Sequence, residues 1–359
     1  MSHLFVDISS HGFGHLAQTA PVLNALHLRC PNLQLTIRSG LPQERLAQRI
    51  KPLFRHIEEA SDFGFAMLDA LRIDHLATRA RYRELLADWD RRVAADAALL
   101  EDKEVDFVLS NVSYLPLAGA QMAGVASAAM CSLNWAELFA HFYLREGDEE
   151  AKLINSRISV AYAASDFLSL TPAMPMPSLV NAVTMPPVVD PVLSRRSELQ
   201  RKLGHPERMV LVGFGGIPTA LPFAPGERLR DVRYLVPAAW ADAAHLPHCV
   251  AQESLGLSFS DLLASVDAVI TKPGYGTFVE AGAAGTPVLY LRRDDWPEQE
   301  ALIDWLGAHG VMCEIPESAL HDGSLGHALV DLWQRPFQPR PDTNGASVVA
   351  DWLAQRLRT

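Results

Sequence analysis

The sequence contains little cysteine, no long apolar run and no short internal repeat. Its four cysteines lie far apart, without a CxxC pair: Cys30, Cys131, Cys249 and Cys313. That spacing fits neither a disulfide framework nor a zinc knuckle, and it predicts a reducing, cytoplasmic environment. No stretch reaches the roughly 18 apolar residues of a transmembrane helix, so no integral membrane segment is expected. The first residues lack a basic segment, and Asp7 interrupts their apolar run, which predicts a strand and not a signal peptide.

Positive charge is scarce as well. The chain has 31 lysine and arginine residues against 42 aspartate and glutamate residues, a formal net charge of −11 at pH 7. No block of like charge is long enough to form a polyanion-binding arm, and we expect no nucleic acid partner. One or two cations and the positive end of a helix can still hold a small anion in an acidic protein.

What the sequence does contain is an alternation of short apolar runs and helical patterns. Its 359 residues, 49% of them hydrophobic and 20% charged, exceed what one hydrophobic core usually holds. Strands are expected at residues 4–9, 33–38, 106–110, 126–131, 166–170, 209–214, 233–238, 248–252, 267–271 and 287–292. Helices are expected at 15–28, after Pro42, and at 72–100, 117–123, 194–204, 277–284, 297–308 and 345–357. This order predicts an α/β fold of two doubly wound, Rossmann-like domains with mainly parallel sheets.

A proline-rich segment at residues 171–191 separates the two halves. Prolines remove backbone donors and oppose both helices and central strands. The expected organisation is an N-terminal domain at 1–185, a linker at 186–207, a C-terminal domain at 208–340 and a C-terminal helix near the domain junction at 341–359. Two doubly wound domains in this order place a cleft where the carboxyl ends of their strands face one another.

A strand, a glycine loop and a helix follow one another in VITKPGYGT at residues 269–277. The unpaired amides and the dipole at a helix N-terminus bind anions, and Gly274 and Gly276 let a phosphate approach the backbone. Lys272 adds a cation, and Glu280, one turn into the helix, can accept hydrogen bonds from ribose hydroxyls. The same residues also fit a plain strand-to-helix turn with Lys272 in solvent.

A second glycine loop follows the first strand, in SSHGFGHLA at residues 9–17. His15 stands at the start of a helix, where an imidazole serves as a general base or as a capping or packing group. His11 and His15 flank a turn and share no helix face, so no metal site is expected. Gly12 and Gly14 also open a G-x-G-x-x-A dinucleotide pattern, which would require Arg38 to bind the 2′-phosphate of NADP.

A third glycine run, VGFGGIP at residues 212–218, ends the first strand of the second half. Gly215 and Gly216 allow a ligand to approach the backbone closely, and they equally suit a tight turn without a ligand.

Together these segments resemble glycosyltransferases of the GT-B fold, including plant-type UDP-sugar transferases and the lipid-linked N-acetylglucosaminyl transferase of peptidoglycan synthesis. The sequence is most similar to the glycosyltransferase-like N-terminal domain of L-arabinokinases. The resemblance covers nearly the whole chain and rests on HGFGHLAQTAPVL, SDFGFAMLDALRIDHLATRARY, DFVLSNVSYLPLAGAQMAGVASAAMCSLNWAELF, LVGFGG, KPGYGTFVEAGAAGTPVLYLRRDDWPEQEAL and GASVVADWLAQRL.

The resemblance implies a donor site and a catalytic base. His15 would deprotonate an acceptor hydroxyl, Glu280 would hold the donor ribose, and Glu298 with Gln299 would bind sugar hydroxyls. The full set of expected donor-binding residues is Gly12, Gly14, Gly215, Gly216, Lys272, Gly274, Tyr275, Gly276, Thr277, Glu280, Glu298 and Gln299.

The implied reaction is an inverting, metal-independent transfer of a hexosyl or N-acetylhexosaminyl group from a nucleotide-sugar, expected to be UDP-linked, to an acceptor that the sequence does not specify. The nucleotide-sugar is a substrate, so no cofactor is expected, and no oligomeric state is predicted. Plant-type transferases orient their base with an aspartate where this chain has Ser110 and Asn111. Asn111 can orient an imidazole tautomer but carries no charge to stabilise an imidazolium.

Two alternatives follow from the same residues. A nucleotide-sugar-binding protein without catalysis is consistent with Asn111, and an NADP-dependent oxidoreductase is the less favoured interpretation of the first loop. An acceptor pocket would use Phe63, Tyr114, Asn134 and Trp135, although such side chains more often pack in a core.

Overall fold

The computed structural model describes residues 2–180, 182–191, 193–217, 219, 221–225, 229, 231–240, 246 and 248–357. The chain divides into two compact units. Unit 1 comprises Met1–Ala66, Ile73–Asp190 and Thr343–Thr359, and unit 2 comprises Met67–Arg72 and Pro191–Asp342. The boundary after residue 190 lies inside the segment 186–207 that was predicted as a linker.

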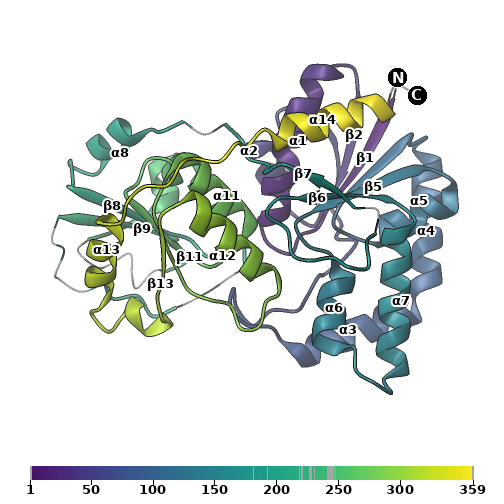
Figure 1. Ribbon diagram of the computed structural model, residues 1–359. Coiled ribbons are helices and arrows are strands. Elements are labelled where there is room, and N and C mark those ends of the chain that lie inside the picture. Colours follow the sequence, from purple (N-terminus) through teal and green to yellow (C-terminus); the bar gives the residue numbers. More distant parts are fainter. Residues whose placement is uncertain are drawn as a thin grey trace. The chain divides into compact units, whose positions relative to one another are not determined.

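Unit 1 is built on a seven-stranded parallel sheet in the order β3-β2-β1-β4-β5-β6-β7 (Figure 1). Its strands are β1 (His3–Ile8), β2 (Gln34–Arg38), β3 (Arg55–Ile57), β4 (Phe107–Asn111), β5 (Ala126–Cys131), β6 (Asp166–Leu170) and β7 (Val183–Met185). Its helices are α1 (Gly14–Arg29), α2 (Gln43–Arg49), α3 (His75–Ala87), α4 (Trp89–Asp102), α5 (Leu115–Ala123), α6 (Trp135–Tyr143), α7 (Glu149–Ala163) and α14 (Gly345–Arg356). The nearly continuous apolar run of β1 follows from its burial on both faces.

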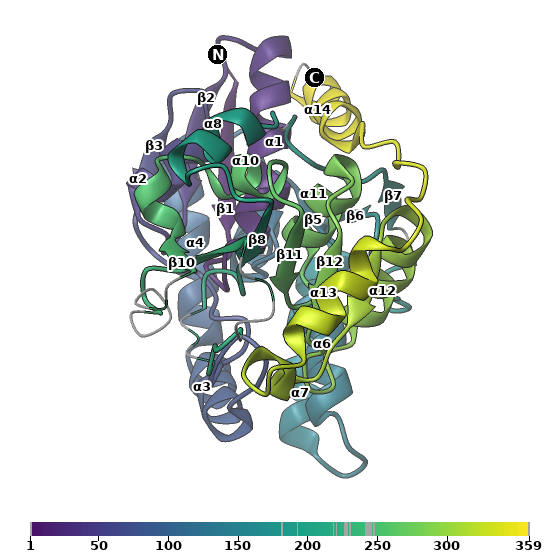
Figure 2. The ribbon, with the colours of Figure 1, turned by 90° about the vertical axis from the view of Figure 1, so that its left-hand side faces the viewer.

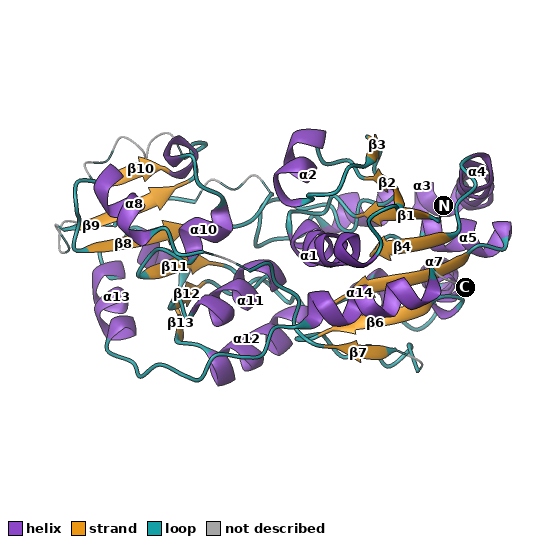
Figure 3. Cartoon of the chain, turned by 90° about the horizontal axis from the view of Figure 1, so that it is seen from above, coloured by secondary structure: helices purple, strands orange, loops and turns teal. Residues whose placement is uncertain are grey.

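Helix α14 belongs to unit 1 and packs along α1 (Figures 1 and 3). Its first residue, Gly345, donates its amide to the carbonyl oxygen of Pro187 at 3.0 Å. A Cβ atom at Gly345 would lie only 2.2 Å from the carbonyl oxygen of Pro186. Glycine is therefore required where the last helix meets the end of the proline-rich segment.

Local structure in unit 1 differs from the sequence-based expectation in several places. The helix expected over 72–100 begins later, because Asp74 caps α3 by accepting from the amide of Ala77 at 2.9 Å, and it breaks at Asp88. Strand β7 forms inside the proline-rich segment, and it can do so because it is an edge strand with one unpaired side. Helices α6 and α7 were not among the predicted elements.

Unit 2 contains a six-stranded parallel sheet in the order β10-β9-β8-β11-β12-β13. Its strands are β8 (Arg208–Val212), β9 (Val232–Val236), β10 (Cys249–Ala251), β11 (Ala268–Thr271), β12 (Val288–Tyr290) and β13 (Met312–Glu314). Its helices are α8 (Arg196–Lys202), α10 (Phe259–Leu263), α11 (Tyr275–Ala284), α12 (Glu298–His309) and α13 (Leu325–Trp333), with short 3-10 turns η1 (Gln252–Leu255) and η2 (Glu317–Leu320). Helix α13 packs against β12 and β13, and Figure 2 labels α13 and β12. The predicted pair of doubly wound α/β domains is confirmed.

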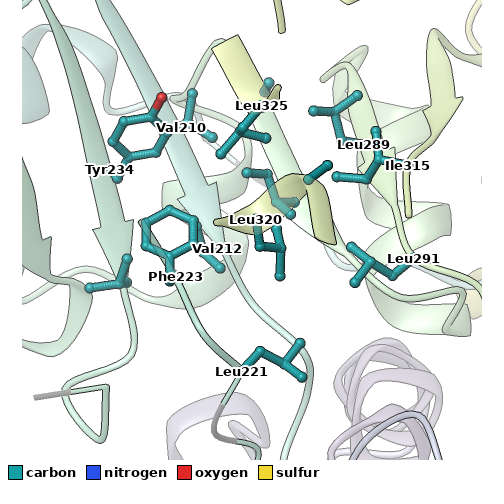
Figure 4. Packing of buried hydrophobic residues seen from close by; sticks show 14 of the residues in the cluster. Val210, Val212, Leu221, Phe223, Tyr234, Leu289, Leu291, Ile315, Leu320 and Leu325 are labelled. Carbon is teal, nitrogen blue, oxygen red and sulfur yellow. The ribbon is translucent and has the colours of Figure 1, made fainter. Parts of the chain in front are cut away.

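One face of the unit 2 sheet carries the hydrophobic core shown in Figure 4. Alternate residues of the strands point into it, such as Val210 and Val212 of β8, beside Leu325 of α13. The core also includes Ala70 and Leu71, which come from the segment 67–72. The part of the chain that the structure describes contains no helix long and apolar enough to cross a bilayer.

Candidate active site

Most of the predicted site residues lie near the carboxyl ends of the strands where each sheet reverses its order. These points lie between β1 and β4 in unit 1 and between β8 and β11 in unit 2. Open parallel sheets bind ligands at such points, because the loops leave the two neighbouring strands in opposite directions. His15 follows β1 and Asn111 ends β4, whereas the loop before Tyr275 follows β11 and the glycine run follows β8.

His15 is held by a chain of side-chain hydrogen bonds. It lies in the first turn of α1 and is 5% exposed. Its Nδ1 lies 2.9 Å from Oδ1 of Asn111. Asn111 in turn donates its Nδ2 to Oε1 of Gln18 at 3.0 Å, and Gln18 donates its Nε2 to Oγ of Ser132 at 2.8 Å. The network is buried throughout.

This chain of amides fixes the tautomer of His15. Because Asn111 uses its NH2 group on Gln18, its carbonyl oxygen faces the imidazole and can only accept. Nδ1 of His15 therefore carries the proton and Nε2 carries the lone pair, which is the form that a general base needs. Asn111 supplies orientation, and it supplies no negative charge.

A buried carboxylate that no sequence pattern marks contacts the same region. Asp62 accepts from Nε1 of Trp135 at 2.6 Å and from Oγ of Ser9 at 2.8 Å. The indole of Trp135 meets the ring of His15 edge-on, with centroids 5.7 Å apart. Burial, reinforced by the nearby charge of Asp7, raises the pKa of Asp62 to about 6. An ionisable group therefore lies next to the His15 network, with Trp135 in contact with both Asp62 and His15.

Arg38 is not available for a 2′-phosphate, and that interpretation is wrong. Its Nε donates to Asp7 at 2.6 Å, and its two terminal nitrogens donate to Asp96 at 2.6 and 2.9 Å. Burial lowers the pKa of Arg38, but the two carboxylates raise it by more, so the guanidinium is locked in a charged cluster. A buried arginine between two acids supports the fold and leaves no place for a third anion.

The four residues considered for an acceptor pocket make core contacts. Trp135 and Tyr114 are fully buried, and the Asn134 side chain caps α6 by accepting from the amide of Glu137. Phe63 packs against an aromatic neighbour from α3, with centroids 4.8 Å apart. All four side chains therefore contribute to the packing of unit 1, and their role in an acceptor pocket stays a prediction.

The cysteines are free thiols. Cys131 is buried, with its Sγ atom 3.8 Å from Nδ1 of His15. Within the described ranges, no group of three or more His, Cys, Asp or Glu side chains is arranged to hold a metal ion.

In unit 2, helix α11 presents an uncapped N-terminus. Gly274 is its N-cap residue and makes no side-chain cap, and the first turn, from Tyr275 through Gly276 and Thr277, contains no acidic residue. The first amides and the positive end of the macrodipole therefore lack a side-chain acceptor from the cap position. A Cβ atom at Gly274 would lie 3.3 Å from Nζ of Lys272, so the amine lies beside the start of the helix.

A second cation, Arg293, accompanies Lys272. Arg293 follows β12, is 5% exposed and lies over Trp296, with Cζ 3.6 Å from the ring centroid. Among the described residues, its Nε and Nη2 atoms find no hydrogen-bond partner. Burial and the charge of Arg293 lower the pKa of Lys272 to about 7, and Glu298 opposes this shift. Burial lowers the pKa of Arg293 to about 9, again against Glu298.

The acidic residue and glutamine at the start of α12 lie against Arg293. Gln299 accepts from the amide of Arg293 at 3.0 Å and donates Nε2 to its carbonyl oxygen at 3.1 Å. Glu298 accepts from Nε1 of Trp296 at 3.2 Å. Glu280 lies in the second turn of α11 and is 3% exposed. Contacts of Glu280 with a ribose, and of Glu298 and Gln299 with a sugar, stay predictions.

The glycines after β8 serve different purposes. A Cβ atom at Gly213 would lie 2.5 Å from Cε2 of Phe259, so this glycine permits close packing against α10. Gly215 has φ +86°, a conformation that suits glycine, and a Cβ there would meet open space, as it would at Gly12 and Gly14 of unit 1. Gly216 continues the same turn. The space beside the backbone is therefore open at Gly215 in unit 2 and at Gly12 and Gly14 in unit 1.

A comparison with known proteins finds a relative of this chain. The chain is 25% identical over 311 residues to L-arabinokinase of Arabidopsis thaliana, and the match covers 83% of this chain. The matched region is 29% of that protein's length, so the chain spans less than a third of its relative. No family model matches the sequence.

Solved structures resemble the chain over its whole length. The glycotransferase of kitacinnamycin superposes with a TM-score of 0.60 at 15% identity, covering 99% of this chain and 94% of that one. The glycosyltransferase VinC, solved with dTDP, gives 0.58 at 15% identity, with coverage of 99% and 95%. UGT2 of Phytolacca americana, complexed with UDP-2fluoro-glucose and pterostilbene, gives 0.54 at 13% identity, with coverage of 99% and 94%. These superpositions, with the two parallel sheets, show that the chain has the GT-B fold of glycosyltransferases.

Proposed function

We propose that this chain is a glycosyltransferase that moves a sugar from a nucleotide-sugar to an acceptor hydroxyl, with inversion and without a metal ion. The observation that carries the proposal is the hydrogen bond from Nδ1 of His15 to Asn111 at the ends of β1 and β4, in a chain with the GT-B fold. Neighbours of the same fold have been solved with dTDP and with UDP-2fluoro-glucose, which supports a nucleotide-linked donor.

The proposed reaction uses the two units for different tasks. Nε2 of His15 takes the proton of the acceptor hydroxyl, whose oxygen attacks the anomeric carbon opposite the leaving group. The bond from that carbon to the terminal phosphate oxygen breaks, and its electron pair leaves with the diphosphate. Lys272 and the N-terminus of α11 stabilise the charge that develops there. Attack from the opposite face predicts inversion.

A panel of UDP-, dTDP- and GDP-linked sugars tests this function by the release of nucleoside diphosphate, with and without simple alcohol acceptors. Loss of the base in His15→Ala should slow release by roughly 10²- to 10⁴-fold. Gln18→Leu is a matched variant that keeps the base and removes only the support of Asn111, so we expect a smaller loss. Release that is unaffected by His15→Ala would remove this residue from the mechanism.

A nucleotide-sugar-binding protein without transferase activity is the second candidate. The observation that favours it is Asn111 as the partner of His15, because an amide does not stabilise an imidazolium by charge. Tight binding of a nucleotide-sugar without diphosphate release, across a broad set of acceptors, would decide for this candidate.

A further inference from the structure

We infer that Arg293 binds the donor diphosphate, and that with Lys272 and the N-terminus of α11 it forms one anion site that carries the charge of the leaving group. The identity of the ligand rests on the proposed function. The site itself rests on the side chains of unit 2.

Two adjacent arginines after β12 have opposite surroundings. Arg292 is partly exposed and forms ion pairs with Glu300 and Glu314. Arg293 is 5% exposed, and none of the described carboxylates forms an ion pair with it. Buried arginines normally have a paired anion or a full set of acceptors, because an unpaired charge away from water is unfavourable. Position 293 therefore holds a buried cation whose Nε and Nη2 atoms have no partner among the described residues.

The two unpaired atoms of Arg293 form a fork. Nε and Nη2 lie on the same edge of the planar guanidinium, and among the described residues both lack a partner. Such an edge donates two parallel hydrogen bonds to two oxygens of one phosphate or carboxylate. One flat face of the guanidinium lies against the ring of Trp296, which leaves this edge uncovered by the ring. An oxyanion is the ligand that this geometry fits.

The topology brings Arg293 to the same edge of the sheet as Lys272. Strands β11 and β12 are parallel neighbours, with Thr271 opposite Tyr290, so the residues that follow them leave the sheet at one end. The amine of Lys272 lies beside the start of α11. The lowering of the pKa of Lys272 by Arg293 agrees with two cations held close together. Repulsion between them is relieved by an anion that touches both.

The charges match a diphosphate. With Lys272 protonated, as it is beside a bound anion, Lys272 and Arg293 contribute two positive charges. The end of α11 adds about half a charge, and Glu298 contributes one negative charge. A nucleotide-sugar diphosphate carries about two negative charges and has several oxygens to share among the donors. A single carboxylate would leave one cation unpaired, so a diphosphate fits better than a uronic acid group alone.

Gln299 is a positioning residue for Arg293. Its side-chain amide accepts from the backbone N–H of Arg293 and donates to the carbonyl oxygen of Arg293, which holds the backbone that carries the guanidinium in place. A leucine at position 299 would remove both bonds while leaving the charges in place. We expect that variant to weaken diphosphate binding less than the loss of Arg293 itself.

Calorimetry on the full chain tests the inference with UDP, dTDP, GDP, their nucleosides and inorganic pyrophosphate as probes. Arg293→Met should weaken the binding of the preferred nucleoside diphosphate by roughly ten- to a hundredfold, the range for hydrogen bonds to a charged group, and leave nucleoside binding unchanged. Arg292→Met is the matched control and should stay within about twofold of the original chain. The melting temperature of Arg293→Met without ligand should equal or exceed that of the original chain, because an unpaired buried charge is removed.

Two results overturn the inference. One is unchanged diphosphate affinity in Arg293→Met, and the other is a failure of the original chain to bind any diphosphate or pyrophosphate. If Arg293→Met does not fold, Arg293→Lys keeps the charge and removes the fork, and it should still lose at least about fivefold in affinity. Binding of pyrophosphate that depends on Arg293, with no binding of any nucleoside diphosphate, would support the anion site and refute the proposed function.

Discussion

Binding of a nucleotide-sugar to unit 2 should take up a proton at Lys272. Burial and Arg293 hold the pKa of this amine at about 7. A bound diphosphate favours the charged form and returns the pKa toward the ordinary value of about 10.4. Above pH 7 the bound state therefore holds more protons than the free state, and affinity falls as the pH rises.

The size of the effect follows from the pKa of Lys272, which lies at about 7. Near pH 8 about nine-tenths of the free amine is neutral, so binding takes up roughly 0.9 proton. Between about pH 6 and pH 9 the dissociation constant should rise roughly a hundredfold, or about 2.7 kcal/mol. The same group affects folding: its depressed pKa means that the unfolded chain binds the proton first, so its contribution to stability increases as the pH rises from about 7 to about 10.

Calorimetry near pH 8 in two buffers of different ionisation heat measures the proton uptake directly. A nucleotide-sugar is the better probe, because the terminal phosphate of a free diphosphate titrates near pH 6 and adds its own protons. Lys272→Met should bind more weakly near pH 6 and show no uptake. Uptake below about 0.2 proton in the original chain, or equal uptake in Lys272→Met, would refute the assignment of this group.

Three further changes test unit 1. Asn111→Asp should speed diphosphate release roughly tenfold or more, since a carboxylate beside His15 stabilises the imidazolium; slower release with an unchanged circular dichroism spectrum would contradict this. Asp62→Asn should raise the free energy of unfolding near pH 7 by up to about 3 kcal/mol. The raised pKa of Asp62 gives stability below pH 4 that is lost as the pH rises through about 6, because the buried side chain then becomes charged, whereas asparagine stays neutral. Equal urea midpoints near pH 7 would exclude it. Gly345→Ala should lower stability by about 3 kcal/mol through its clash with the proline carbonyls, whereas Gly14→Ala, which meets open space, should change it by less than about 0.5 kcal/mol.

Much of the fold could be predicted because parallel strands buried on both faces appear as short continuous apolar runs. The runs at β1, β4 and β11 needed no information from elsewhere in the chain. Strand β7 was missed because the prolines around it oppose strands in general, and only its place at the sheet edge makes it possible. The break at Asp88 leaves the helical pattern nearly intact on both sides, so periodicity did not reveal it.

Among the candidate site residues, some could be predicted from the neighbouring sequence, whereas others depend on residues far away in the chain. The glycine loops and Asn111 could be found because each stands next to a strand end in the sequence. Arg38 stands at such an end too, but its partner Asp96 lies 58 residues away and decides its role. Asp62 and Arg293 acquire their properties from burial and from the presence or absence of partners, which no short sequence pattern records.

The segment 67–72 has a consequence for any exchange of parts between relatives. Ala70 donates its amide to Thr219 at 3.0 Å, the carbonyl oxygen of Leu71 accepts from Asp294 at 3.3 Å, and both side chains lie in the core of unit 2. A chimera joined at residue 190 would take most of unit 2 from one parent and this small piece of the unit 2 core from the other. Grafting residues 67–72 together with 191–342 should give the better folded hybrid, because the folding unit that must be exchanged is discontinuous in the sequence.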